Sequence, residues 1–431
     1  MKIRIEKLIY EGYGLGHTED GKAIFVKKSV PGDLLEVEII KEKKNFAHAL
    51  LKSVIEPSPQ RIEPKCPHFD RCGGCEHQNI AYADQLKFKE DIFKETLSRF
   101  HVETNVLPII AGSKEPFFYR NTILFSFFAD SNDSISVAMH DYPHFTDLIP
   151  IDQCFLQSEL CNQLIAEIKA LINDQIEEKK TFKFLRIRQG KMTNEVMVEL
   201  ITDNEVLPHK NDFIALAKKH PEIKSFYHDV QNADGKKYRN LLFGSLTIKE
   251  KVDRMTYQIS PQTFFQTNSL GIKTLYDSVK NFADIKMGES VFDFYCGAGT
   301  IGLYLSTLAK KVSGVEANQN AINDAKANIK INNVKNVEFI CDDASRYIEK
   351  IKEDFDVLIF DPPRAGLTKN IIEKASKMKF KRIVYVSCDP ATFARDIKEF
   401  ENFGVKLQNV QPIDMFPQTH HIECVGLLIK Q

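Results

Sequence analysis

The regular alternation of apolar strands with amphipathic helices, from about residue 260 to residue 431, constrains the fold of this chain most. Strand-like runs such as VFDF, VSGVEA, DVLIF and RIVYVS are separated by helix-like runs such as IGLYLSTLAKK and QNAINDAKANIKI. This pattern predicts a doubly wound, mainly parallel sheet with helices on both faces. Ligands bind such sheets at the carboxyl ends of the strands, so the residues that follow each strand are the first candidates for a site.

The length of 431 residues predicts more than one domain, because a single hydrophobic core rarely grows that large. Residues 1–57 show short strands separated by turn signals, which predicts a small β-barrel. A proline-rich polar stretch then predicts an extended connector. We assign residues 58–258 to a central α+β region, part of which could pack with the last domain, and residues 259–431 to the α/β domain.

Composition and charge narrow the setting in which the protein works. Hydrophobic residues make up 43% and charged residues 27%, and the sequence contains neither an apolar signal core nor a membrane-spanning run. We therefore expect a soluble, cytoplasmic protein with no membrane contact. The net charge is -1, so any site for a polyanion must be local. Nothing in the sequence indicates an obligate protein partner.

A glycine-rich turn follows the strand VFDF and directly precedes a helix. It begins at Asp293 and contains Gly297 and Gly299, which let the backbone approach a ligand closely. An acidic residue after the next strand, Glu316, can hold ribose hydroxyls. The turn is not GxGxxG, and it looks like the D-x-x-x-G-x-G turn of class I S-adenosylmethionine methyltransferases. The simpler alternative is an ordinary tight turn in an α/β protein.

Two further strand ends carry acidic residues. Asp342 or Asp343 follows the third strand and is expected near an adenine ring, and we take Asp343 as the candidate. Asp361 lies at the end of the fourth strand, in the sequence DPPR. Like Glu316, these residues follow predicted strands, which strengthens the prediction of a ligand site at this edge of the sheet.

A thiol at the same edge predicts a particular chemistry. Cys388 directly follows the strand RIVYVS, and addition of a thiolate to C6 of uracil makes C5 nucleophilic enough to accept a methyl group. A carboxylate must then remove the C5 proton, and Glu423 is our candidate. Taken singly, Cys388 could be a small core residue and Glu423 a surface carboxylate on an edge strand.

Five segments together resemble the RNA uracil-5-methyltransferase family across nearly the whole chain: SCDPATFARD, HIECV, DFYCGAG, DPPRAG and SPQTFFQTN. The resemblance implies that Cys388 is the nucleophile and Glu423 the base. The S-adenosylmethionine contacts that it implies are Gln266, Tyr295, Glu316 and Asp361, and we add Gly297 and Asp343 from their places after strands. Thr300 and Asp389 depart from the Asn that is common in the family.

Four cysteines outside this domain suggest a metal centre. Cys66, Cys72 and Cys75 have the spacing C-x5-C-x2-C, and Cys154 is the candidate for a fourth ligand. The spacing does not separate zinc from an iron–sulfur cluster. The resemblance to bacterial ribosomal RNA enzymes of the family implies a 4Fe-4S cluster with a structural or RNA-orienting role. The C-x3-C-x2-C spacing of radical S-adenosylmethionine enzymes does not occur.

Candidate RNA contacts lie in three places. The first 56 residues resemble a TRAM domain, and their segment KEKKNFAHALLK combines cations with a phenylalanine. Arg186 and Arg188 share one face of a predicted strand, and five more cations are clustered in residues 374–382, so both sets are candidate phosphate tracks. Of Phe264 and Phe265, we expect one to stack on a flipped base and the other to pack in the core.

These observations predict an enzyme that uses S-adenosylmethionine to methylate C5 of uridine in structured RNA. Ribosomal RNA, most simply 23S rRNA, is the favoured substrate, because bacterial tRNA relatives in the family generally lack the barrel and the four cysteines. A tRNA uracil-5-methyltransferase is the nearest alternative. The DPP sequence also allows an amino-group methyltransferase, although Arg364 replaces the aromatic residue of that motif. A third alternative is an RNA-binding iron–sulfur protein with a relict transferase domain.

Overall fold

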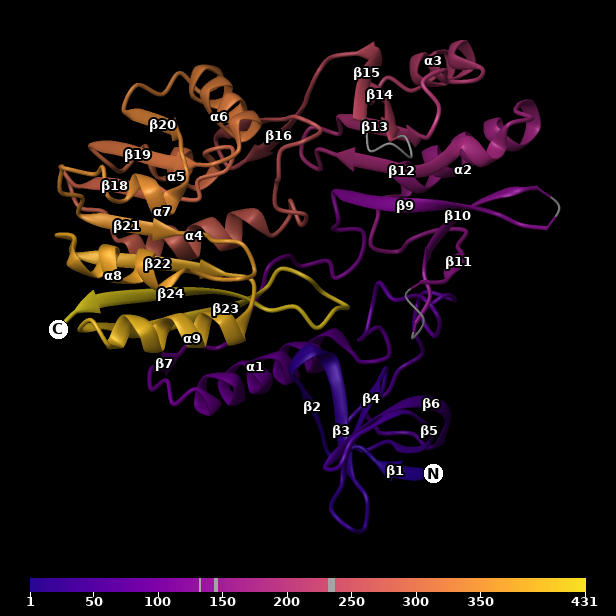
Figure 1. Cartoon of the computed structure of the whole chain (residues 1–431), viewed down its shortest axis with the longest axis horizontal. Coiled ribbons are helices and arrows are strands. Elements are labelled where there is room, and N and C mark those ends of the chain that lie inside the picture. The colour runs from indigo at the N-terminus through magenta and orange to yellow at the C-terminus, as the bar shows by residue number, and fades with distance from the viewer. Residues whose placement is uncertain (132, 143–145, 232–236) are drawn as a thin grey trace.

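The N-terminal sheet curls into a small barrel at one end of the molecule (Figure 1). The computed structural model describes residues 1–131, 133–142, 146–231 and 237–431. The sheet has the order β1-β5-β6-β4-β3-β2, and alternate residues of its strands are buried. Its strands are β1 (Lys2–Arg4), β2 (Lys7–Ile9), β3 (Tyr13–His17), β4 (Ala23–Lys27), β5 (Leu34–Glu42) and β6 (Phe46–Glu56). A 3-10 turn, η1 (Tyr10–Gly12), joins β2 to β3.

A second sheet forms the central region, and its order is β11-β10-β9-β12-β13-β14-β15. Neighbouring strands run antiparallel except β13 and β14, which are parallel. Apolar faces of two helices, α2 (Glu159–Gln175) and α3 (Lys210–Lys219), share its core. The strands are β9 (Thr122–Ala129), β10 (Ile135–His140), β11 (Leu148–Pro150), β12 (Phe182–Gln189), β13 (Val196–Thr202), β14 (Ile223–Gln231) and β15 (Lys237–Gly244), with η2 (Lys179–Thr181) before β12.

The third large sheet is the predicted doubly wound sheet, in the order β20-β19-β18-β21-β22-β24-β23-β7. Five neighbours, β20 to β22, run parallel, and the antiparallel hairpin β23–β24 extends the sheet beyond β22. The strands are β18 (Ser290–Phe294), β19 (Lys311–Glu316), β20 (Val337–Cys341), β21 (Val357–Phe360), β22 (Arg382–Ser387), β23 (Val405–Asp414) and β24 (Glu423–Lys430).

Two short strands from much earlier in the chain complete this sheet at its edge. β7 (Asn105–Val106) and β8 (Ile110–Ala111) both pair in parallel with β23. The central sheet lies between these strands and the rest of the α/β domain in sequence. It is therefore an insertion into the unit that carries the third sheet.

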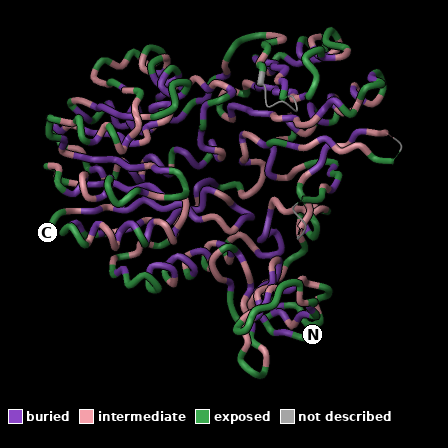
Figure 2. Tube along the Cα trace, in the orientation of Figure 1, coloured by how far each residue is buried: buried purple, intermediate pink, exposed green. Residues whose placement is uncertain are grey.

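Helices cover both faces of the third sheet, and its strands are buried along most of their length (Figure 2). One face packs against α1 (Tyr82–Arg99), α7 (Ala344–Tyr347), α8 (Lys369–Lys377) and α9 (Pro390–Glu401). The other packs against α4 (Ile272–Ala283), α5 (Thr300–Leu305), α6 (Gln319–Ile331) and the hairpin β16 (Ile248–Val252)–β17 (Met255–Ile259). Among the described residues, no helix is both long enough and apolar enough to span a membrane.

Candidate active site

The turn after β18 has the shape of a ligand cradle. Tyr295, Gly297 and Gly299 all have left-handed backbone angles, with φ of 62°, 53° and 74°. A methyl group added at Gly297 would meet no protein atom within 4 Å, whereas one at Gly299 would lie 2.3 Å from the Phe339 ring. Glycine is therefore required at 299 for packing, and Gly297 leaves open space beside its backbone.

Acidic side chains border this turn. Glu316 accepts a hydrogen bond from the Gly297 N–H at 3.2 Å, so its carboxylate lies at the turn as the sequence predicts. Asp293 accepts from the Gly302 N–H at 3.1 Å, and its other oxygen is buried without a hydrogen-bond partner in the structure. Burial raises the pKa of Asp361 to about 7, and the charges of Asp361 and Glu316 add to burial in raising the pKa of Asp293.

Two other predicted cofactor residues, Asp343 and Tyr295, lie around the same edge. Asp343 caps α7, where one of its oxygens accepts from the N–H groups of Ser345 and Arg346. Burial and the negative charges of Asp343 and Glu316 raise the pKa of Tyr295 to about 12. Gln266 is buried in the loop before α4. The roles of these residues toward a cofactor stay predictions.

The register between β22 and β24 brings the predicted nucleophile and base together. Ser387, the last residue of β22, pairs with Cys424 in antiparallel register. Cys388 follows directly after β22, and Glu423 is the first residue of β24. The charge of Glu423 raises the pKa of the Cys388 thiol, so the two groups lie near each other. Glu423 and Cys424 are successive strand residues, so their side chains point to opposite faces.

Burial and nearby carboxylates raise the pKa values of both groups. The pKa of the Cys388 thiol rises to about 12 because of burial and the negative charges of Glu423 and Asp361. The pKa of Glu423, which is 1% exposed, rises to about 8 because of burial and the negative charge of Asp361. Arg364 opposes both shifts, because its positive charge favours the thiolate and the carboxylate.

Arg364 was not among the predicted site residues. Its guanidinium lies 3.2 Å from a ring nitrogen of His421, in the segment that leads to Glu423. Burial, reinforced by the charges of His420 and Arg364, lowers the pKa of His421 to about 3, so the ring is neutral near pH 7. The DPPR sequence could have pointed to this cation, because it places Arg364 three residues after Asp361.

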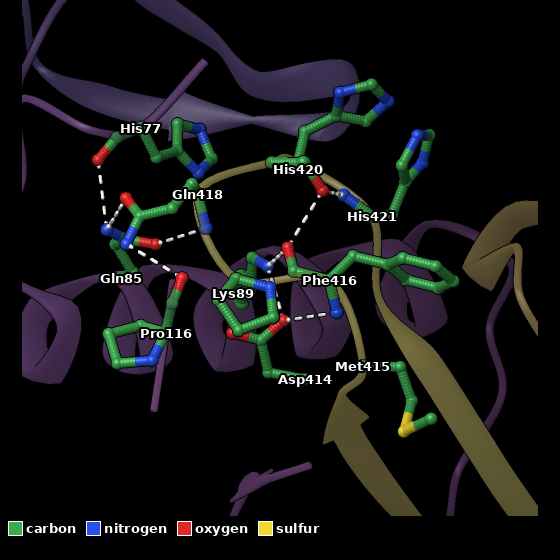
Figure 3. A network of polar contacts seen from close by, with 12 residues as sticks. His77, Gln85, Lys89, Pro116, Asp414, Met415, Phe416, Gln418, His420 and His421 are labelled. Atoms are coloured by element: carbon green, nitrogen blue, oxygen red, sulfur yellow. Dashed lines mark hydrogen bonds and ion pairs between the residues drawn. The ribbon is translucent and has the colours of Figure 1, made fainter. Parts of the chain in front are cut away.

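The loop between β23 and β24, which leads to Glu423, is held by a buried polar network (Figure 3). Lys89 of α1 lies fully buried and donates to Asp414 at 2.7 Å and to the Phe416 carbonyl at 3.1 Å. The Phe416 N–H donates back to Asp414 at 3.0 Å. Gln85, one helical turn earlier, donates to the Gln418 side chain at 2.9 Å and accepts from its N–H at 3.0 Å. Helix α1 therefore holds the loop that leads to Glu423.

The segment that carries the two phenylalanines connects this loop to the central sheet. Phe264 is 70% exposed and Phe265 is 5% exposed, so one projects and the other packs in the core, as expected. Arg188 donates to the carbonyls of Ser260 and Thr263, at 2.9 and 3.1 Å. On the other side, Asn268 donates to the Met415 carbonyl at 3.0 Å.

The two predicted phosphate tracks do not fit the structure. Arg188 is buried and holds backbone carbonyls, and Arg186 pairs with the buried Glu199 at 3.1 Å. The cations of residues 374–382 lie at or before the amino end of β22, opposite the end that carries Cys388. They also pair with neighbouring carboxylates: Lys374 with Glu349, Lys377 with Glu373, Lys379 with Asp354, Lys381 with Glu289 and Asp356, and Arg382 with Glu289.

The four predicted metal ligands line one cavity of about 620 Å³, together with Phe264, Arg120, Arg186 and Arg239. Two thiols accept N–H groups, Cys72 from Gly74 at 3.4 Å and Cys75 from the Gln78 side chain at 3.3 Å. In the part of the chain that the structure describes, no three potential ligands converge closely enough to hold a single metal ion. The structure therefore does not support the predicted 4Fe-4S cluster. Cys388 and Glu423 are not among the residues that line this cavity.

Comparison with known proteins matches these features. The family model described as tRNA (uracil-5-)-methyltransferase matches residues 81–431, and the TRAM domain model matches residues 1–52. An uncharacterized RNA methyltransferase of Halalkalibacterium halodurans is 36% identical over 451 residues, covering 99% of this chain and 96% of that protein. One from Clostridium tetani is 35% identical, covering 97% of this chain and 94% of that protein.

A solved structure has the same architecture along nearly the whole chain. It is the crystal structure of Pyrococcus abyssi tRNA (uracil-54, C5)-methyltransferase in complex with S-adenosyl-L-homocysteine. The two chains are 29% identical, with a TM-score of 0.79 and 99% of each chain covered. The predicted fold class is confirmed: a Rossmann-like domain, a central α+β region and an N-terminal TRAM barrel.

Replacing Lys89 by Met should destabilise the protein strongly, because Asp414 would keep a buried charge without its partner. We expect a loss of roughly 3–5 kcal/mol in the free energy of unfolding, measured by urea denaturation. Lys87→Met is the matched control on the same helix, since Lys87 is exposed and pairs only with Asp84. It should change the free energy by about 1 kcal/mol or less. Equal losses for the two variants would contradict the proposed support of the loop.

Proposed function

This chain belongs to the RNA uracil-5-methyltransferase family, and we propose that it methylates C5 of uridine in 23S rRNA through a covalent bond to Cys388. The observation that carries the proposal is that Cys388, directly after β22, lies close enough to Glu423, the first residue of β24, for the charge of Glu423 to raise the pKa of the thiol. An amino-group methyltransferase needs no thiol at this edge. A transferase domain that has lost its activity does not need a cluster of acidic side chains with raised pKa values, whereas an active site does.

S-adenosylmethionine is the proposed cofactor, and the turn after β18 fits it. The fit rests on the open space beside Gly297 and on the buried oxygen of Asp293 that lacks a partner. The residues proposed to hold it are Gln266, Tyr295, Gly297, Glu316, Asp343 and Asp361. When bound, the cofactor supplies an electrophilic methyl group. The protein's part is to make the acceptor carbon nucleophilic and to remove its proton.

The proposed reaction uses Cys388 first. The thiol loses its proton to solvent, and the thiolate adds to C6 of uracil, so that the electrons of the C5–C6 double bond move onto C5 as an enolate. The positive charge of Arg364 favours the thiolate against the burial that opposes it. C5 would then form a bond to the methyl group as the sulfur–methyl bond of S-adenosylmethionine breaks and leaves S-adenosylhomocysteine, while the C5 hydrogen remains attached.

Glu423 then completes the proposed reaction. Its ionised carboxylate takes the C5 proton, the released electrons re-form the C5–C6 double bond, and the carbon–sulfur bond breaks to return the Cys388 thiolate. The raised pKa of Glu423, about 8, makes its carboxylate a stronger base than an exposed glutamate.

The choice of 23S rRNA rests on the barrel and the four cysteines, which accompany ribosomal RNA enzymes in the bacterial part of the family. A tRNA substrate is the second candidate, because the similar Pyrococcus abyssi structure is that of a tRNA (uracil-54, C5)-methyltransferase. In either case the barrel offers a surface suited to unpaired bases. Its rings are Tyr13, Phe25, Phe46 and His48, with Lys27 5.0 Å from the Tyr13 ring centre and Lys43 5.6 Å from that of Phe46.

We propose that Cys66, Cys72, Cys75 and Cys154 hold a 4Fe-4S cluster with a structural role. All four line one cavity, and two accept N–H groups, as cluster ligands do. Four thiolates around one zinc ion must stand about 4 Å apart, whereas a cluster separates its ligands further. The shared cavity and the cysteine spacing support one common centre, and the cluster is chosen over zinc because of the resemblance to bacterial ribosomal RNA enzymes.

Cys388→Ala should abolish methylation and the covalent adduct with RNA that contains 5-fluorouridine, because no thiolate reaches C6. Glu423→Gln should still form an adduct with ordinary RNA but release it slowly, lowering turnover about 100-fold or more. Denaturing gels and methyl incorporation measure both outcomes. Cys341→Ala, at the exposed end of β20, is the control and should behave as wild type. Retained methylation by Cys388→Ala would reject the thiol mechanism.

The rate of a single turnover should rise with pH through about 8. Glu423 acts as a base only when ionised, and its ionised fraction grows as pH approaches its pKa of about 8 from below. Ionisation of the thiol adds a rise in the same direction. We expect an increase of more than about tenfold between pH 6.5 and 8 under saturating RNA. A rate that is constant over this range would contradict the assigned base.

Deleting the gene should remove 5-methyluridine from defined positions of 23S rRNA and leave tRNA unchanged. Mass spectrometry of the two separated RNA classes, with and without a plasmid copy of the gene, measures this. Loss of the modification from tRNA alone would overturn the 23S assignment and support the second candidate.

Protein purified without oxygen should contain about four irons and four acid-labile sulfides per chain. Cys154→Ser should lose most of both. Cys161→Ser is the matched control, because Cys161 is buried in α2 and does not line the cavity. One zinc per chain in place of iron would overturn the cluster.

A further inference from the structure

The turn η1 at the tip of the N-terminal barrel contacts both segments that carry the proposed catalytic pair. One of these segments follows Cys388, and the other precedes Glu423. η1 lies more than 370 residues away from Cys388 in sequence. Its two contacts involve different residues and different physical interactions.

The first contact is a hydrogen bond from Tyr10 to Asp389. The Tyr10 hydroxyl donates to one Asp389 oxygen at 2.5 Å. The other oxygen accepts from the N–H groups of Ala391 and Thr392, at 3.0 and 2.9 Å, and so caps α9. Burial and the hydrogen bond to Asp389 raise the pKa of Tyr10, so the phenol remains a donor near pH 7. Asp389 is thereby fixed on both sides, directly after Cys388.

The second contact is a close approach of Gly12 to His420. Gly12 has φ of +73°, and a methyl group there would lie 2.8 Å from the His420 Cβ and 3.1 Å from the His77 ring. The His420 N–H donates to Glu76 at 3.3 Å. Lys27 of the barrel lies 3.8 Å from the same carboxylate. The barrel therefore bounds the loop that ends at Glu423.

Other contacts already dock the barrel, so these two are not needed for docking. Leu8 and Val30 are buried in the core that contains α1 and α9. Lys7 also pairs with Glu95 of α1 at 2.9 Å. The Tyr10 hydroxyl adds little apolar area to this interface, yet it donates a hydrogen bond to Asp389, the residue next to Cys388.

We propose that Tyr10 and Gly12 are positioning residues, through which the barrel holds the Cys388 turn and the Glu423 loop at a fixed separation. This inference rests on the proposed function, because it concerns the geometry of the same two groups. It gives the barrel a part in the chemical step in addition to any contact with RNA. Small displacements of reacting groups lower rates by large factors, so the loss of either contact should appear in the rate of adduct formation.

Tyr10→Phe tests the first contact, because it removes only the hydroxyl. With saturating RNA that contains 5-fluorouridine, the rate constant for adduct formation should fall about tenfold, while RNA affinity changes less than twofold. Asp389→Ser supplies the partner for a double-mutant cycle, since serine can still cap α9 but is too short to reach Tyr10. In that background Tyr10→Phe should have no further effect. Lys7→Met, which breaks only the ion pair with Glu95, should leave the rate unchanged.

Gly12→Ala tests the second contact. Its control is Gly21→Ala, because Gly21 has φ of +83° and a methyl group there meets no atom within 4 Å. Both variants carry similar backbone strain, but only Gly12→Ala presses on His420. We expect adduct formation to slow by about tenfold for Gly12→Ala and to match wild type for Gly21→Ala. Melting temperatures separate the loss of rate from the loss of fold.

Three results would overturn the inference. The first is an unchanged rate constant in both Tyr10→Phe and Gly12→Ala, with wild-type protein forming the adduct. The second is a loss of RNA affinity that accounts for the whole effect. The third is an additive cycle with Asp389→Ser. If wild-type protein forms no adduct, the proposed function fails first and the inference falls with it.

Discussion

The antiparallel register of β22 and β24 is the constraint on which the site depends. β22 ends at Ser387 and β24 begins at Glu423, so the two strands share the edge at which a parallel sheet binds ligands. A slip of one residue would turn Glu423 to the opposite face and leave Cys388 beside a residue of different chemistry. The insertion of β24 between β22 and β23 thus converts a ligand-binding edge into one that holds a thiol and a carboxyl together.

Burial gives this edge its unusual electrostatics. Asp361 lies near both Asp293 and Glu423, which are each 1% exposed, and burial raises the pKa of all three. Arg364 is the cation that opposes these shifts at Glu423 and Cys388. A site of this kind holds protons near neutral pH that an exposed site would lose. The loop that leads to Glu423 is held from outside the sheet, by the buried ion pair between Lys89 of α1 and Asp414.

Local patterns predicted the elements, and contacts between distant segments could not be predicted. The strand–helix alternation gave the parallel strands, and residue spacing gave the exposed Phe264 beside the buried Phe265. Alternation along the strand also predicted that Arg186 and Arg188 share one face. It could not indicate that Arg188 is buried against the carbonyls of Ser260 and Thr263. The partners of Lys89 and Tyr10 lie more than 300 residues away, and no periodicity records such pairs.

The place of the central sheet in the chain has a mechanical consequence. The chain leaves the third sheet after β8, where the Gly112 N–H bonds to the Asp414 carbonyl at 2.9 Å, and it returns through β16 and β17, which pack on α4 and α6. A body attached by two strands rather than one linker cannot drift freely.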